Sequence, residues 1–119
     1  MVSLDDVARI ALALPGVEEG STYGSRSWKL RGRLVVWERP LRRRDLDELG
    51  DAAPAGTVLG AAVEGEDEKR ALVQSEPEAF FTTHHFDGHP TVLVRLESID
   101  EPRLAELVET AWLVRGGRR

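Results

Sequence analysis

The dipeptide Asp87-Gly88 separates two apolar runs, and it constrains the fold of this chain more than any other feature. Both residues tolerate a positive φ, which the two central positions of a tight hairpin turn require. Residues 79–86 and 91–96 are rich in aromatic and β-branched side chains, as strands are. The sequence therefore predicts a β-hairpin with its tip at the dipeptide and with Phe81 opposite Val94.

A second hairpin is predicted over residues 26–39, with a turn around Gly32. Hydrophobic and polar residues alternate before the turn, and a hydrophobic run follows it. Pairing across this turn puts four large side chains on one face, which we expect to be the core face: Trp28, Leu30, Val35 and Trp37. A small, apolar third strand is predicted over residues 57–63.

Helices are predicted at both ends of the chain. Ser3 is a favourable N-cap for the first helix, and Asp100 caps a last helix that runs from about Glu101 to Arg115. A short helix over residues 66–75 lies between the strands, and Asp45 to Leu49 could form one helical turn. The predicted order, α-β-β-β-α-β-β-α, is that of an α+β domain with a mostly antiparallel sheet.

We expect one compact domain over residues 1–115, followed by a short basic tail over residues 116–119. Periodicity places twelve hydrophobic side chains on inward faces, and these are the predicted core: Val7, Ile10, Leu14, Trp28, Leu30, Val35, Trp37, Phe81, Val92, Val94, Leu107 and Ala111.

Composition excludes several classes of protein. The 119 residues include no cysteine, so disulfides, cysteine nucleophiles and cysteine-ligated metal clusters are excluded. No apolar run approaches the roughly 20 residues that span a bilayer. The first six residues are acidic rather than basic, unlike a signal peptide, and we expect a cytoplasmic protein with no membrane partner.

The sequence carries none of the common catalytic or cofactor-binding motifs, so we expect a protein that is not an enzyme and has no cofactor. The chain has no nucleophile elbow, no phosphate-binding loop and no dinucleotide-binding glycine pattern. The three histidines are the one cluster that could bind a metal. On the predicted hairpin, however, His84 and His89 share a face while His85 points to the other, so no metal site is expected.

The charge of the chain is strongly segregated. The net charge is −5, yet residues 26–44 hold eight basic side chains against one acid, and residues 45–68 hold eight acids and no base. In one interpretation, the arginines of the first segment simply pair with the acids of the second. In the other, they contact nucleic acid, and the candidate residues are Lys29, Arg31, Arg33, Arg42, Arg43 and Arg44.

Several segments spread over nearly the whole chain carry a family pattern. They are Leu14-Pro15-Gly16-Val17-Glu18-Glu19, Trp37-Glu38-Arg39-Pro40-Leu41 with Leu46 and Leu49-Gly50, Glu76 to Thr83, His85-Phe86-Asp87-Gly88, Pro90 to Leu96 and Asp100 to Trp112. Together they resemble the MmcQ/YjbR-like proteins. The resemblance implies a compact α+β fold with two hairpin wings, similar to the frataxin-like fold, and the DNA binding with which the family is labelled. It supplies no catalytic residues.

The chain departs from the family pattern at the predicted hairpin tip. His84-His85 stands where relatives have proline and histidine, and His89-Pro90 stands where they have tyrosine and proline. We expect a non-enzymatic DNA-binding protein that is a monomer or a weak dimer. The alternatives are a protein- or small-ligand-interaction module whose concave sheet face receives a partner, and a metal-handling role by analogy with frataxin.

Overall fold

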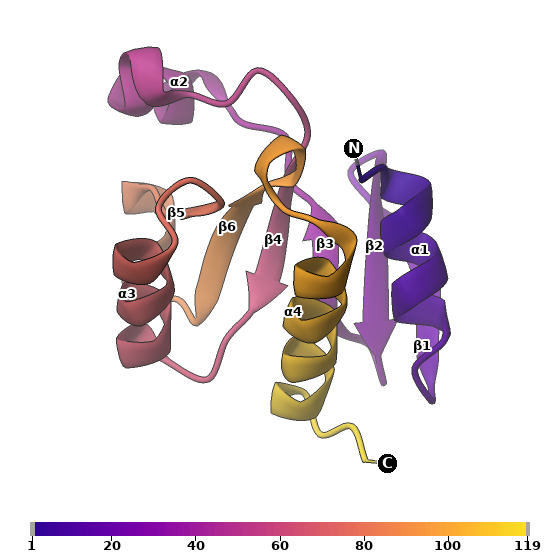
Figure 1. The fold of residues 1–119 in the computed structure, drawn as a ribbon. Helices are drawn as coiled ribbons and strands as arrows, with labels where there is room; N and C mark the ends of the chain where they lie inside the picture. The colour runs from indigo at the N-terminus through magenta and orange to yellow at the C-terminus, as the bar shows by residue number, and fades with distance from the viewer. Residues whose placement is uncertain (1, 119) are drawn as a thin grey trace.

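Six strands form one sheet in the order β1-β2-β3-β4-β6-β5, and each neighbouring pair is antiparallel (Figure 1). The computed structural model describes residues 2–118, so Met1 and Arg119, the ends of the predicted domain and tail, lie outside the described residues. The elements are α1 (Leu4–Leu12), β1 (Val17–Thr22), β2 (Ser25–Leu30), β3 (Arg33–Glu38), α2 (Arg43–Leu49), β4 (Val58–Ala62), α3 (Glu66–Ser75), β5 (Phe80–Phe81), β6 (Thr91–Arg95) and α4 (Glu101–Val114). The predicted α+β class is confirmed.

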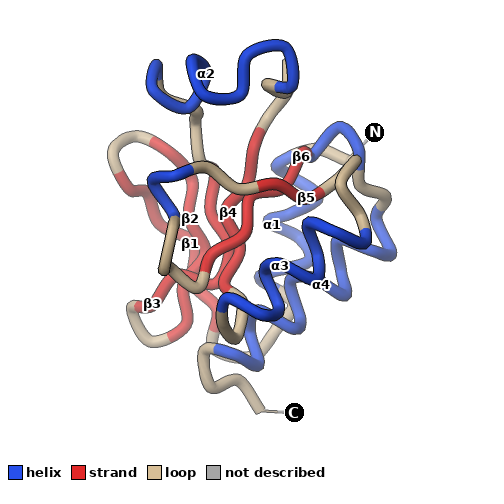
Figure 2. The backbone as a smooth tube through the Cα atoms, turned by 90° about the vertical axis from the view of Figure 1, so that its left-hand side faces the viewer, coloured by secondary structure: helices blue, strands red, loops and turns tan. Residues whose placement is uncertain are grey.

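Three helices cover one face of the sheet. Figure 2 shows α1, α3 and α4 together on one side, while α2 lies beyond the end of the sheet. The main core fills the space beneath the covering helices, and Trp28, Leu59 and Trp112 are among its fully buried side chains. A smaller cluster of Val58, Phe81, Phe86 and Leu93 is packed separately, with Leu41 and Leu49 against it. In the described part of the chain, no helix is long and apolar enough to cross a membrane.

The helix ends follow the predicted caps. The Ser3 hydroxyl accepts a hydrogen bond from the Asp6 N–H, and the Asp6 carboxylate accepts one from the Ser3 N–H, which forms a capping box at α1. Asp100 accepts a hydrogen bond from the Arg103 N–H and begins α4. Local side-chain chemistry therefore defines the start of both terminal helices.

The predicted hairpin at Asp87-Gly88 is wrong in its strands and register. β5 has only two residues, and Phe81 lies opposite Leu93 rather than Val94. A 3₁₀ turn over His84–Phe86 replaces the rest of the predicted strand. Asp87 has φ −58° and ψ 127°, and Gly88 has φ 77°, which is a type II turn rather than a hairpin turn of the primed types.

The predicted face of Trp37 is also wrong. Trp28 is paired with Val36 and Lys29 with Leu34, so Val35 is an extra residue in β3 that forms a β-bulge. Beyond the bulge, Trp37 is paired with Ser27, and it therefore lies on the face opposite to Trp28. Nine of the twelve predicted core residues are buried, and the three that are only half-buried are Ile10, Leu14 and Trp37.

Two elements differ from the predicted order. The segment Val17–Thr22 forms the edge strand β1, which the sequence did not indicate, because four of its six residues are Glu, Gly or Ser. A two-residue turn at Tyr23 and Gly24, both at positive φ, pairs it with β2. The predicted helical turn over residues 45–49 is a complete short helix, α2, that begins at Arg43.

Candidate functional site

The chain leaves the sheet at the end of β3 and enters α2 through a short arginine-rich segment. The Arg39 N–H donates to the Val58 carbonyl at 2.8 Å, so this residue is still held to the start of β4. The Asp45 carboxylate then accepts a hydrogen bond from the Arg42 N–H at 2.9 Å, inside the first turn of α2. Helix α2, which follows Arg42 and begins with Arg43 and Arg44, lies beyond the upper end of the sheet in Figure 1.

A buried ion pair anchors this segment. Arg39 is 9% exposed, and its Nη2 lies 3.4 Å from Oδ2 of Asp45, which is 4% exposed. The guanidinium of Arg39 also lies 5.2 Å from the ring centroid of Phe86 and donates to the Pro40 carbonyl. These contacts fix α2 against the 84–86 turn. Arg39 therefore has a structural role, whereas the arginines that follow it at positions 42 to 44 are exposed to solvent.

The exposed arginines line a cavity of about 520 Å³. Its walls are formed by Arg39, Arg42, Arg43, Arg44, Asp45, Glu48, His84 and His85. Four arginines and two carboxylates leave a formal excess of two positive charges when the histidines are neutral. Arg42, Arg43 and Arg44 are exposed and form no ion pair within residues 2–118. The cavity is thus suited to an anion.

A second cavity, of about 440 Å³, adjoins the first and shares Arg39, Arg42 and His85 with it. The other residues that line it include the aromatic side chains of Tyr23, Trp37 and Phe86. Trp37 lies opposite Gly60 in the sheet, and a Cβ atom at position 60 would collide with the indole ring. The absence of a side chain at Gly60 is what allows Trp37 to lie flat against the sheet.

The other three predicted contact residues lie at the opposite end of β3. Arg31 is in the turn between β2 and β3, and Arg33 begins β3, whose six residues span roughly 17 Å. Lys29 lies opposite Glu18 in the sheet register, so an acidic residue shares its face of the sheet. The structure therefore brings Arg42, Arg43 and Arg44 together but separates them from Lys29, Arg31 and Arg33.

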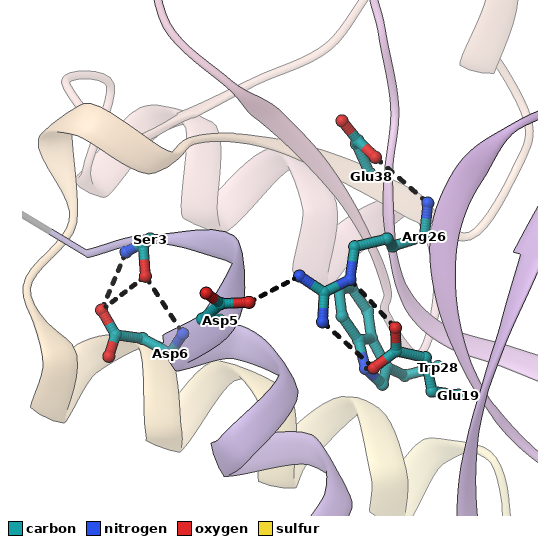
Figure 3. Close-up of polar contacts among 7 residues, drawn as sticks. All are labelled: Ser3, Asp5, Asp6, Glu19, Arg26, Trp28 and Glu38. Atoms are coloured by element: carbon teal, nitrogen blue, oxygen red, sulfur yellow. Dashed lines mark hydrogen bonds and ion pairs between the residues drawn. The ribbon is translucent and has the colours of Figure 1, made fainter.

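Arg26, the first basic residue of the positive segment, is used within the fold (Figure 3). Its Nε and Nη2 donate to the two carboxylate oxygens of Glu19 at 2.9 and 3.2 Å, and its Nη1 donates to Asp5 at 2.9 Å. Glu19 also accepts a hydrogen bond from the Trp28 indole N–H at 3.0 Å. The hydrogen bonds from Arg26 are the main reason that the pKa of Glu19 lies below its ordinary value.

The interpretation that the basic segment pairs with the acidic segment after it holds at one buried contact, Arg39 with Asp45. The partners of Arg26 come instead from α1 and β1, which precede it. Sequence reasoning did not single out either arginine, because their acceptors are fixed only by the folded sheet.

The histidines are arranged differently from the prediction. The rings of His85 and His89 are stacked with centroids 6.5 Å apart, whereas His84 and His89 were expected to share a face. His84 points away to Asp87, with Nδ1 3.2 Å from Oδ2, and to Glu48 at 3.7 Å. Within residues 2–118, no group of three or more histidine, aspartate or glutamate side chains is placed to hold a metal ion.

The contacts of His84 predict a measurable pH dependence. Its pKa is raised above 6.5, first by the hydrogen bond to the Asp87 carboxylate and then by the charge of Glu48. The ion pairs are therefore complete below pH 6.5 and are lost as the pH rises through the higher, folded-state pKa. We expect an NMR titration of the His84 ring to show this, and Asp87→Asn to move the pKa back towards 6.5. A midpoint at or below 6.5 in the unmodified protein would contradict the prediction.

The family model described as YjbR matches residues 12–114. The chain belongs to the YjbR family. The match confirms the family resemblance seen in the sequence, and the segment from Trp37 to Leu41 that contributed to that resemblance lines the second cavity.

Relatives and a solved structure extend the YjbR assignment. "Uncharacterized protein Rv2570" of Mycobacterium tuberculosis and "Uncharacterized protein Mb2600" of Mycobacterium bovis are each 42% identical over 122 aligned residues, covering 100% of this chain and 92% of the relative. The crystal structure of Deinococcus radiodurans protein DR2400, of the DUF419 domain family, matches with a TM-score of 0.70 at 19% identity. The match covers 96% of this chain and 78% of DR2400. At this level of identity, it shows a likeness of fold and nothing more.

Proposed function

We propose that this YjbR protein is a non-enzymatic DNA-binding protein whose phosphate contacts come from Arg42, Arg43 and Arg44. The observation that supports this is their placement: three exposed arginines without ion pairs in the described chain surround one cavity. The planar guanidinium carries five N–H donors in a fork that matches two phosphate oxygens at once. Several phosphate groups of one DNA strand can therefore contact these arginines at the same time.

The charge balance favours this end of the sheet over the other. Lys29 and Arg31 share a smaller hollow of about 190 Å³ with Glu18 and Glu19, whose carboxylates oppose a phosphate. Arg33 lies near Arg115, but it is not one of the residues that line this hollow. Three of the six predicted contact residues therefore carry the proposal, and the other three provide its control.

The whole chain has a net charge of −5, so binding has to be local and strongly dependent on salt. Each phosphate contact on duplex DNA contributes roughly −0.9 to the slope of log affinity against log salt. We expect Arg42→Ala, Arg43→Ala and Arg44→Ala, combined, to weaken binding to a labelled oligonucleotide and to flatten this slope by up to about three units. Fluorescence anisotropy over a salt series measures both quantities.

The matched control is the triple variant Lys29→Ala, Arg31→Ala and Arg33→Ala, which removes the same number of positive charges from the opposite end of β3. We expect it to change the slope by less than about one unit. If the unmodified protein does not bind an oligonucleotide at low salt, DNA binding is rejected. If the slope falls only in the control variant, the arginines beside α2 are the wrong surface.

A small ligand is the second candidate, and the shape of the second cavity favours it. Ligand pockets typically enclose about 300–1,000 Å³ and combine apolar walls with a few polar groups. The cavity of about 440 Å³ has Trp37, Leu41 and Phe86 among its lining residues, and three arginines also line it. A flat, anionic molecule is the class of ligand that fits this lining.

A further inference from the structure

We infer that the DNA recognised at this site is single-stranded, and that an unpaired base enters the second cavity and stacks on Trp37. This inference rests on the proposed function, because the strand is held by the same arginines. It concerns the form of the nucleic acid and the part of the protein that reads it.

The two adjoining cavities differ in chemistry in the way that the two halves of a nucleotide differ. The first is lined by arginines and carries an excess of positive charge, and the second has aromatic walls. Arg42 and His85 line both cavities, so a ligand can occupy the two together. A nucleotide joins an anionic phosphate to a flat base, and proteins that bind single strands combine a basic groove with aromatic stacking surfaces.

Trp37 is the tryptophan that the fold leaves available. The indole N–H groups of Trp28 and Trp112 donate to Glu19 at 3.0 Å and to the Pro15 carbonyl at 2.9 Å, and both side chains are fully buried. Trp37 is half-buried, and its indole N–H has no hydrogen-bond partner within residues 2–118. It lies against Gly60 and lines the cavity, which leaves it free to contact a base.

Tyr23 provides a second aromatic surface at the edge of the same cavity. It is 98% exposed, and the two-residue turn that holds it is fixed by the pairing of β1 with β2. In a duplex, by contrast, the bases are stacked and paired, and bringing one out of the helix costs a few kcal/mol. The aromatic walls therefore favour a strand whose bases are already unpaired.

The fluorescence of the protein reports on this inference directly. Of the three tryptophans, Trp28 and Trp112 are fully buried, so a base that stacks in the cavity quenches Trp37. We expect the single strand dT12 to quench the emission and to bind at least tenfold more tightly than the dT12·dA12 duplex. Trp37→Ala should weaken dT12 binding by about five- to 150-fold, since stacking on an aromatic side chain contributes about 1–3 kcal/mol per base.

Two further samples separate the alternatives. Trp37→Phe keeps an aromatic ring, so it should bind dT12 within about threefold of the unmodified protein while the quenching disappears. If the alanine variant does not fold, the loss of quenching in Trp37→Phe still tests whether the base contacts Trp37. Thymidine monophosphate tests for a small-ligand site, and it should bind much more weakly than dT12 because it offers one phosphate.

Each outcome distinguishes this inference from the proposed function. Equal binding of dT12 and the duplex without quenching, but with loss of both in the triple arginine variant, overturns the inference and leaves DNA binding intact. Quenching that persists in Trp37→Phe also overturns it. If thymidine monophosphate binds as tightly as dT12, the site binds a small ligand rather than a DNA strand. If neither oligonucleotide binds at low salt, the proposed function fails as well.

Discussion

Replacing Trp28 with alanine should lower the free energy of unfolding by about 3–5 kcal/mol. The side chain is fully buried in the main core, so its removal leaves a cavity that the sheet and helices cannot fill by relaxing. The substitution also removes the hydrogen bond from the indole N–H to Glu19 and the contact with the Arg26 guanidinium, which lies 5.3 Å from the ring centroid. Urea denaturation followed by circular dichroism measures the change.

Trp37→Ala is the matched control in the same hairpin. Trp37 is half-buried, lies on the opposite face and donates no hydrogen bond within the described residues, so we expect its loss to cost less than half as much. The sequence alone placed both tryptophans in the core. A loss below about 1 kcal/mol for Trp28→Ala would contradict its assignment to the core.

Replacing Lys69 with methionine should lower the free energy of unfolding by about 2–4 kcal/mol, because two carbonyl groups lose their donor. Lys69 is 3% exposed, and its Nζ donates to the carbonyls of Phe86 and His89 at 2.8 and 2.9 Å. It also lies 2.9 Å from Oε1 of Glu66. Methionine has a similar unbranched side chain that is one heavy atom shorter and carries no donor, so the substitution tests mainly these contacts rather than packing volume.

Two readouts identify the cause of that loss. The Lys69 hydrogen bond is the main reason that the pKa of Glu66 is low, so the methionine variant should raise this pKa towards 4.5 in an NMR titration. The matched control is Arg70→Met at the next position, whose side chain is 63% exposed and pairs with Asp67 at 3.3 Å. We expect the control to change stability by less than about 1 kcal/mol. Equal losses in the two variants would show that the buried contacts of Lys69 contribute nothing.

Much of the fold could be predicted from local sequence signals. The capping residues Ser3 and Asp100 mark where the terminal helices begin, and α3 spans the ten residues that were expected. Helix ends are readable because each cap is a contact between residues three positions apart. β1 was missed because no local signal marks it. Its polar residues have little strand preference, and it is held by pairing with β2.

The site was less predictable, because it depends on register. One extra residue, Val35, reverses the side of the sheet on which Trp37 lies, and nothing in the alternation pattern reveals a bulge. The composition did single out Arg42, Arg43 and Arg44, but it also grouped them with three residues at the far end of β3. The structural roles of Arg39 and Lys69 could not be predicted from the sequence, because only the folded chain brings them into contact with their partner carbonyls, rings and carboxylates.

The connection that carries the arginines also determines how this fold can diversify. β3 and β4 are adjacent and antiparallel, and their register is set by pairs such as Val36 with Ala61. The chain between them makes a long excursion through α2 that the sheet itself does not need. Its ties to the rest of the molecule are made by a few side chains. Arg39 contacts the Phe86 ring, Glu48 accepts hydrogen bonds from the His84 N–H, and the Ala52 carbonyl accepts one from Arg95. Leu41 and Leu49 pack against the smaller hydrophobic cluster. Substitutions at the exposed positions of this excursion, such as Arg43 and Arg44, can therefore change the charge at this end of the molecule while strand pairing and the main core stay unchanged.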